Sequence, residues 1–157
     1  MKKSLKINFS KTRNFPEIDY YFKCVIRRAV EATLSHEKFP YDAIVSVTLC
    51  DADYIRALNK TYRGKDKPTD VLSFPIYEDG NFDMNECISG ALLGDVVISI
   101  PRAREQAKEL GNPFLKEIAF LTVHSVLHLL GYDHERSADE DELQCRLQRE
   151  ICDSFEV

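Results

Sequence analysis

Three of the four histidines of this chain lie within eleven residues, as His124, His128 and His134. On a helix, residues four apart lie on one face, about 6 Å apart along the axis, so His124 and His128 could bind one ion. Gly131 follows them, and glycine often ends helices because it adopts a left-handed conformation without steric cost. The turn can return His134 to the same point. The spacing predicts a metal site with three nitrogen ligands and an open fourth position, as in catalytic zinc sites.

The helical pair of histidines alone is weak evidence for a metal site. Two histidines at this spacing arise often by chance, and an exposed or hydrogen-bonded imidazole is the usual explanation. The third histidine and the glycine at the required chain reversal favour a metal site. His36 has no such partner, and it lies at an expected helix end, where a cation suits the helix dipole. We interpret His36 as a surface residue.

Two families share the histidine spacing. The metzincin proteases have H-E-x-x-H-x-x-G-x-x-H, in which the glutamate activates the metal-bound water. This chain has Ser125 at the position of that glutamate, and serine is a poor base at neutral pH. Residues 124–134 resemble more closely the H-G-x-L-H-L-x-G-Y-D-H signature of the YbeY family, bacterial rRNA maturation factors described as metal-dependent endoribonucleases. Only Ser125 departs from that signature, replacing a glycine.

The resemblance extends along most of the chain. Residues 58–75 and 93–99 are similar to the second and third signatures of the YbeY family, in the same order. The similarity begins near Val45 and continues into the expected C-terminal helix. It implies a zinc-dependent endoribonuclease for single-stranded RNA, acting in rRNA maturation (16S rRNA 3′ end processing) and in ribosome quality control. Ribosomal proteins or the ribosome are possible partners.

Arg63 is the candidate catalytic residue outside the histidine segment. It matches the arginine of the second family signature, and it lies in a stretch with three lysines. A guanidinium suits the extra negative charge that develops on the phosphoryl oxygens during phosphodiester hydrolysis. The alternative is an ordinary solvated basic turn. Further candidates lie near the metal or along the substrate groove: Asp133, Ser125, Lys65, Asp70 and Asp95.

The expected cofactor is one Zn²⁺ per chain, bound by three histidines and a water, although another divalent metal is possible. Zinc lowers the pKa of its bound water to about 7. A glutamate at position 125 is therefore not needed. Asp133 could orient an imidazole or could be a turn residue. Tyr62, Phe74 and Tyr132 could stack on bases, although aromatic residues are more often part of a core.

Length and composition favour one globular domain spanning residues 1–157. No apolar stretch is long enough to span a membrane. The five cysteines are odd in number and form no C-x-x-C pair, which indicates free thiols and a cytoplasmic location. The net charge of −5 argues against general nucleic-acid binding, and we expect no DNA partner. The charge is polarised, with a basic N-terminal segment and an acidic C-terminal one.

The hydrophobic pattern predicts strands at residues 5–9, 43–49, 71–77 and 92–98. Helices are expected from Pro16 to about Ser35, after Asp51, from Pro101 to Gly111, from Asn112 through the histidines, and after Ser137. Residues 78–89 are expected to form a mobile loop. The order of these elements indicates an α+β fold: a single domain with one mixed, roughly four-stranded sheet packed with several helices. The metal site would lie on a helix followed by a glycine turn.

Two alternative functions remain open. The first is a metalloprotease or another metallohydrolase, although Ser125 argues against a protease. The second is a binding module for ribosome assembly in which the metal is structural. Mutation of Arg63 separates a nuclease from a binding module, because a nuclease needs Arg63 for turnover and a structural metal site does not.

Overall fold

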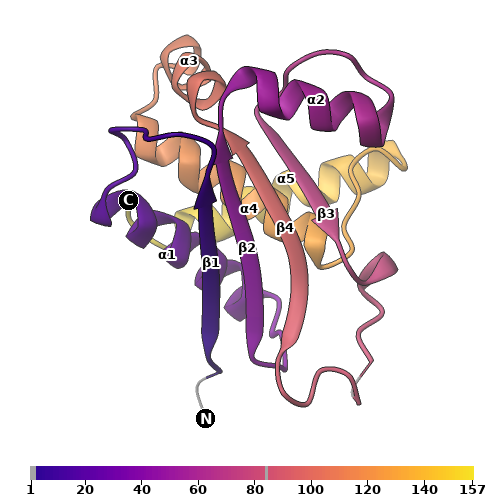
Figure 1. Cartoon of the computed structure of the whole chain (residues 1–157). Helices are drawn as coiled ribbons and strands as arrows, with labels where there is room; N and C mark the ends of the chain where they lie inside the picture. Colours follow the sequence, from indigo (N-terminus) through magenta and orange to yellow (C-terminus); the bar gives the residue numbers. More distant parts are fainter. Residues whose placement is uncertain (1–2, 84) are drawn as a thin grey trace.

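The fold is built on one mixed sheet of four strands, seen in a computed structural model that describes residues 3–83 and 85–157. The strands are β1 (Leu5–Lys11), β2 (Ala43–Cys50), β3 (Val71–Pro75) and β4 (Ala91–Ser99), in the spatial order β1-β2-β4-β3. The first three in that order are parallel, and β3 is antiparallel to β4 (Figure 1). The predicted α+β domain with one mixed four-stranded sheet is confirmed.

The two faces of the sheet carry different cores, because successive side chains of a strand point to opposite faces. On β4, Val96 and Ile98 belong to the main core, whereas Val97 belongs to a small cluster with Ile55 and Leu72. The main core lies between the sheet and the helices α1 (Tyr20–His36) and α4 (Phe114–Leu129). Helix α5 (Ala138–Asp153) packs against these two helices in a second cluster, and Figure 1 shows all three helices behind the sheet.

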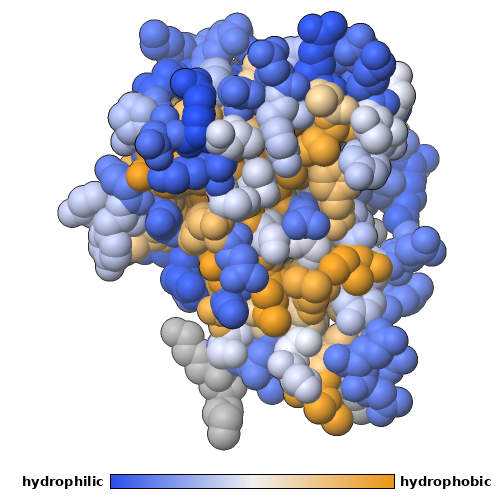
Figure 2. Space-filling view, viewed as in Figure 1, coloured by the Kyte–Doolittle hydropathy of each residue, from blue (hydrophilic) through white to orange (hydrophobic). Residues whose placement is uncertain are grey.

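Helix α2 (Ala52–Arg63) covers the small cluster on the other face. It leaves part of that face open, and there Figure 2 shows apolar residues interspersed among hydrophilic ones. The remaining helix, α3 (Ile100–Leu110), follows directly after β4. The sheet therefore separates a thick helical layer, which contains the histidines, from a thin layer formed by α2.

Helix boundaries follow from side chains that accept hydrogen bonds from the first free amides. The Asp51 carboxylate accepts from the amide of Tyr54 at 3.0 Å, and the Ser137 hydroxyl accepts from the amide of Glu140 at 3.1 Å, as expected for these two helices. The predicted start of the first helix at Pro16 is wrong. The helix begins after Asp19 instead, because the Asp19 carboxylate accepts a hydrogen bond from the free amide of Phe22 in the first turn. Residue 16 lies in a turn that precedes the helix.

The connection between β3 and β4 is anchored to the rest of the fold. It contains a short 3₁₀ helix, η1 (Glu78–Gly80). Beyond η1, the ring of Phe82 contacts Phe39 and Tyr77, with centroid distances of 5.0 and 4.8 Å, and Cys87 is buried. We expected a mobile loop here from its polar composition, but the few apolar residues within it pack onto the core. Residue 84 lies outside the described part of the chain.

No helix among the described residues is long and apolar enough to cross a membrane.

Candidate functional site

A cleft of about 380 Å³ opens where the end of α4, the end of α2 and strand β3 meet. His124, His128 and His134 line it together with Arg63 of α2. Asp133, Glu135 and residues 71–74 of β3 complete its walls, with Tyr62 at its edge. The structure therefore brings the three predicted metal ligands and the predicted catalytic arginine to one place, although 61 positions separate Arg63 from His124 in the sequence.

The three imidazoles are close neighbours. The ring centroids of His124 and His134 are 5.0 Å apart, and those of His128 and His134 are 6.4 Å apart. Rings that share one zinc ion through nitrogens about 2.1 Å from the metal lie about 5 Å apart, so the His124–His134 spacing matches this value and the His128–His134 spacing is wider. All three side chains are half-buried, with the helical pair supported by fully buried Leu127 and Leu129.

Burial keeps the two helical histidines in the neutral form that binds metals. It lowers the pKa of His124 below the ordinary histidine value, and the neighbouring His134 lowers it further, against an opposing effect of the nearby Gln148 amide. Burial also lowers the pKa of His128, although the negative charge of Asp133 opposes this effect. At neutral pH both imidazoles therefore have a lone pair available for a metal ion.

Two observations test how well this cluster fits a metal. The Nδ1 atoms of His128 and His134 are buried and have no hydrogen-bond partner. Three neighbouring imidazoles, of which two have such unpartnered nitrogens, are a donor set of the kind that suits zinc. However, within residues 3–83 and 85–157 no group of three or more His, Cys, Asp or Glu side chains has its donor atoms already placed to hold an ion. Metal binding therefore requires these rings to turn toward a common point.

Gly131 makes the turn that returns His134 to the cleft. Its φ angle is +111°, a conformation that side chains with a Cβ rarely adopt. A Cβ at this position would lie 2.6 Å from the amide nitrogen of Gly80 and 2.7 Å from the carbonyl carbon of Asp79. The η1 segment therefore packs directly against the turn, and both the conformation and the space require glycine here. The predicted role of Gly131 as the residue at which the metal-site helix reverses is confirmed.

Arg63 reaches the cleft from the last residue of α2. Its Nη2 donates to Oε1 of Glu135 at 2.6 Å, and both side chains are partly exposed. Glu135 directly follows His134, so the arginine lies beside the histidine cluster. The structure therefore gives the guanidinium a carboxylate partner beside the histidine cluster. The sequence did not indicate this partner, because Glu135 is one of many acidic residues in its segment.

Ser125 is fully buried and faces β3 rather than solvent. Its hydroxyl forms a short hydrogen bond with the hydroxyl of Ser73. The serine that replaces the usual family glycine therefore joins the histidine helix to the strand beside it. A side chain held in this way is not a free general base.

Asp133 lies in the cleft, but its carboxylate interacts with its own turn. Oδ1 accepts from the amide of Glu135 at 3.0 Å, and Oδ2 pairs with Nε of Arg136 at 3.5 Å. The hydrogen bond from the Glu135 amide is the main reason why the pKa of Asp133 lies below the usual range, and the charges of His128 and Arg136 add to the effect. Asp133 thus stabilises the turn, and its charge acts on His128 from a distance.

The other predicted groove residues do not line the cleft. The carboxylate of Asp70 accepts from the Val71 amide at 2.7 Å and from Nε2 of Gln106 at 3.2 Å, which joins the start of β3 to α3. Asp95 is exposed on β4, and Lys65 is exposed in the loop after α2. None of these three residues is among those that line the cleft.

Two buried glutamines behind the cleft were missed by the sequence analysis. Nε2 of Gln144 lies 3.3 Å from Nδ1 of His124 and donates to its carbonyl oxygen at 3.3 Å. Gln148 is also buried, and its Nε2 has no hydrogen-bond partner among the described residues. Both glutamines come from the core-facing side of α5. The only sequence signal was their polarity at positions where the helical period requires apolar residues.

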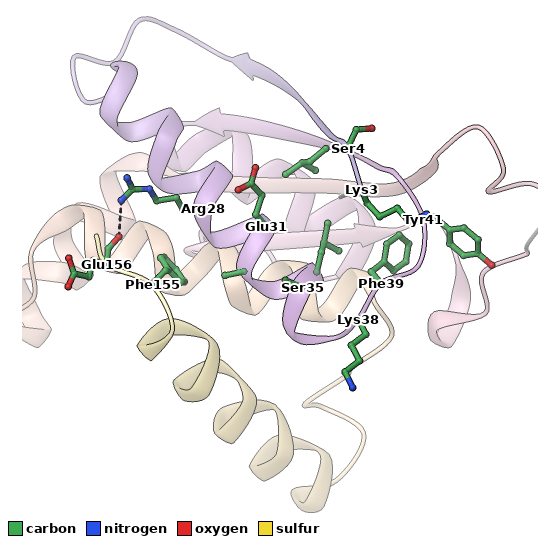
Figure 3. Close-up of a pocket in the computed structure, with 13 residues that line it drawn as sticks. Lys3, Ser4, Arg28, Glu31, Ser35, Lys38, Phe39, Tyr41, Phe155 and Glu156 are labelled. Carbon is green, nitrogen blue, oxygen red and sulfur yellow. Dashed lines mark hydrogen bonds between the residues drawn. The ribbon is translucent and has the colours of Figure 1, made fainter. Parts of the chain in front are cut away.

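A larger hollow lies elsewhere. It has a volume of about 760 Å³ and lies between α1, the start of β1 and the C-terminal segment, where Arg28 donates to the carbonyl oxygen of Glu156 at 3.2 Å (Figure 3). It contains basic and acidic side chains but no histidine or cysteine among the residues that line it. Size alone therefore does not identify the site, and the smaller histidine cleft is the better candidate by chemistry.

Comparisons with known proteins show which family this chain is similar to. The family profile described as Endoribonuclease YbeY matches residues 7–156. Endoribonuclease YbeY of Bacillus cereus (strain B4264) is 46% identical over 143 residues, covering 88% of this chain and 90% of that protein. The Agathobacter rectalis protein of the same name is 43% identical over 151 residues, covering 88% and 91%. The solution structure of TM1509 from Thermotoga maritima has a TM-score of 0.54 at 28% identity, covering 92% of this chain and 88% of that one.

These relatives define the class of protein as a family of endoribonucleases, which are hydrolases acting on RNA. With most of its length matched, this chain belongs to the endoribonuclease YbeY family. The family inferred from the three sequence signatures is confirmed. The roles of the individual cleft residues and the identity of the metal stay predictions.

Proposed function

We propose that this protein is a zinc-dependent endoribonuclease that prefers single-stranded RNA and acts in rRNA maturation, including 16S rRNA 3′ end processing, and in ribosome quality control. Its family membership supports the RNA substrate. The observation that carries the proposal is the convergence of three histidines and Arg63 on one cleft. A site for phosphodiester hydrolysis needs both a group that activates water and a cation that holds the phosphate.

In this proposal the three histidines would hold the zinc, and Gln144 of α5 would orient His124 behind it. When bound, zinc supplies a Lewis acid and an activated water at neutral pH. Arg63 holds a non-bridging oxygen of the scissile phosphate and stabilises the negative charge that grows there. To do so, the guanidinium leaves Glu135, and because this ion pair is exposed to solvent, its loss costs at most about 1 kcal/mol.

The cellular context is proposed on the same basis. Processing of rRNA requires contact with the ribosome or its proteins, and it takes place in the cytoplasm. The five cysteines support this compartment, because all of them are free thiols. Lys60, Lys65 and Lys67 lie close to Arg63 in the sequence, so a local cationic route for RNA toward Arg63 is compatible with a net charge of −5.

The experiment combines metal analysis with an activity assay. Zinc content and cleavage of single-stranded rRNA fragments are measured for the wild type, His128→Ala and Arg63→Ala. The matched control is Arg56→Ala, which removes another exposed arginine of α2 that pairs with Asp66 at 2.9 Å, outside the cleft. We expect about one zinc per wild-type chain, loss of metal and activity in His128→Ala, and a 100- to 1000-fold lower turnover with metal retained in Arg63→Ala.

Two outcomes would contradict this function. If all four proteins cleave RNA equally, the activity comes from a contaminating nuclease. If the wild type holds zinc but does not cleave, the metal is structural and a binding module for ribosome assembly gains support. A protease is disfavoured independently, because Ser125 is buried and bonded to Ser73.

A further inference from the structure

Tyr62 is a large aromatic side chain exposed beside the cleft. It is 67% exposed, occupies the last turn of α2 directly before Arg63, and lines the same cleft as the three histidines. Single exposed aromatic residues are common on protein surfaces and need no explanation by themselves. Tyr62 does need an explanation, because it lies next to the arginine proposed to hold the phosphate.

The ring of Tyr62 is held in place by the fold. Phe74 of β3 contacts it with a centroid distance of 5.3 Å and an interplanar angle of 66°, which is an edge-to-face arrangement. Such contacts orient an aromatic ring at a small energetic gain. Because Tyr62 is nevertheless mostly exposed, the contact leaves much of the ring surface in solvent. A supported and exposed ring can accept a planar ligand without first being ordered.

The other aromatic candidates do not share this arrangement. The hydroxyl of Tyr132 donates to Glu37, and burial together with this bond raises the pKa of Tyr132 to about 12, so its role is structural. Phe74 is half-buried beneath Tyr62. Tyr54 lies on the same helix and is 42% exposed, but it does not line the cleft. Tyr62 is therefore the aromatic ring best placed to meet a ligand in the cleft.

We propose that Tyr62 forms a nucleobase-stacking subsite for the nucleotide next to the phosphate held by Arg63. This inference rests on the proposed function and adds a reason for its substrate class. In a duplex both faces of a base are covered by stacked neighbours, whereas a base of a flexible single strand can turn out onto an aromatic ring. The subsite therefore favours unpaired RNA and tolerates different bases, because every base has an aromatic face.

The surrounding charge suits this ligand. Lys60 lies one helical turn before Arg63, and Lys65 and Lys67 follow in the loop. Cations of this kind attract the phosphate backbone without reading its sequence. Base stacking on an aromatic side chain changes affinity by roughly 5- to 150-fold. We expect Tyr62 to act mainly on the KM for RNA and much less on kcat, because it lies beside the reacting phosphate.

The test measures binding separately from cleavage. The dissociation constant of a fluorescently labelled 2′-O-methyl RNA decamer is determined by anisotropy for the wild type, Tyr62→Phe, Tyr62→Ala and the matched control Tyr54→Ala. We expect Tyr62→Ala to bind at least tenfold more weakly, with Tyr62→Phe and Tyr54→Ala close to the wild type. Urea unfolding confirms that each variant folds. Equal affinity of Tyr62→Ala and the wild type, or no binding by the wild type, would overturn the subsite.

A second measurement uses the absence of tryptophan from the chain. In Tyr62→Trp the new residue is the sole tryptophan, so its emission reports on the subsite alone. We expect the single-stranded decamer to quench this emission and the same decamer annealed to its complement to leave it unchanged. Unchanged emission with both, or equal quenching by both, would contradict stacking on unpaired bases. A wild type that binds but does not cleave RNA would remove the nuclease function and leave the subsite standing.

Discussion

The residues on either side of His128 in α4 are fully buried. Arg63, in contrast, lies at the exposed end of α2, a helix with only two buried residues. His128 and Arg63 both face the same cleft. Metal ligands must keep fixed mutual distances, so they benefit from a rigid and buried support. A side chain that must release one partner and hold a phosphate benefits from solvent and from weak ion pairs. Under the proposed function, the helical layer would fix the metal, and the thin layer on the other side of the sheet would contact the RNA.

The two glycines that end these segments provide the largest test of this comparison. Gly131 and Gly64 both have positive φ angles, but a Cβ meets backbone atoms at Gly131 and nothing within 4 Å at Gly64. We expect Gly131→Ala to lower the free energy of unfolding by about 3 kcal/mol, and Gly64→Ala to lower it by about 1 kcal/mol. Urea denaturation of both variants measures the difference. Similar losses would mean that the η1 contact contributes nothing to the turn.

Ser125 tests how the histidine helix is fixed to the sheet. Ser125→Gly restores the usual family residue but removes the hydrogen bond to Ser73 and places glycine within a helix. We expect the free energy of unfolding to fall by about 1.5 kcal/mol. Ser73→Ala is the control, because it removes the same bond without changing the helix. A Ser125→Gly variant as stable as the wild type would show that the bond between the two hydroxyls contributes no stability.

The hydroxyl of Tyr132 donates a hydrogen bond to Glu37 and so connects the histidine turn to the end of α1. We expect Tyr132→Phe, which removes this hydrogen bond, to lower the free energy of unfolding by about 1 kcal/mol. The pKa of Tyr132 in the folded state is raised to about 12, above the ordinary value of 10. Its contribution is therefore fully present below pH 10 and is lost as the pH rises toward 12. Unfolding measured from pH 8 to 11.5 should show the gap between wild type and variant narrowing above pH 10. If the stability difference between the wild type and Tyr132→Phe does not change with pH, the hydrogen bond to Glu37 is not its source.

Glu135 tests the exposed side of the cleft, and there we expect the smallest effect on stability. Glu135→Gln removes the charge that pairs with Arg63, so the free energy of unfolding should change by less than about 0.5 kcal/mol. The affinity for single-stranded RNA should rise a few-fold, because the guanidinium no longer has a competing carboxylate. The control is Asp66→Asn, which frees Arg56 outside the cleft. Weaker binding by Glu135→Gln would mean that Glu135 itself contacts the substrate.

Much of the site could be predicted from short-range patterns. The helical spacing of His124 and His128, the glycine reversal and the caps of α2 and α5 were all confirmed, because each depends on residues within one or two turns. The start of α1 was misplaced, because two possible start signals, Pro16 and Asp19, lie three residues apart. The anchoring of the loop before β4 was missed, because its few apolar residues show no period.

The sequence by itself determined the elements, the histidine trio and the candidate arginine, since periodicity, capping and motif spacing act along the chain. Only the tertiary structure decided which of these residues meet. The strand order β1-β2-β4-β3 places β3 beside the histidine helix, so Ser73 reaches Ser125 and Arg63 reaches Glu135 across 52 and 72 positions. The same order leaves Asp95 on the open face of the sheet. Such long-range pairings depend on how whole layers pack, and no local pattern encodes that packing.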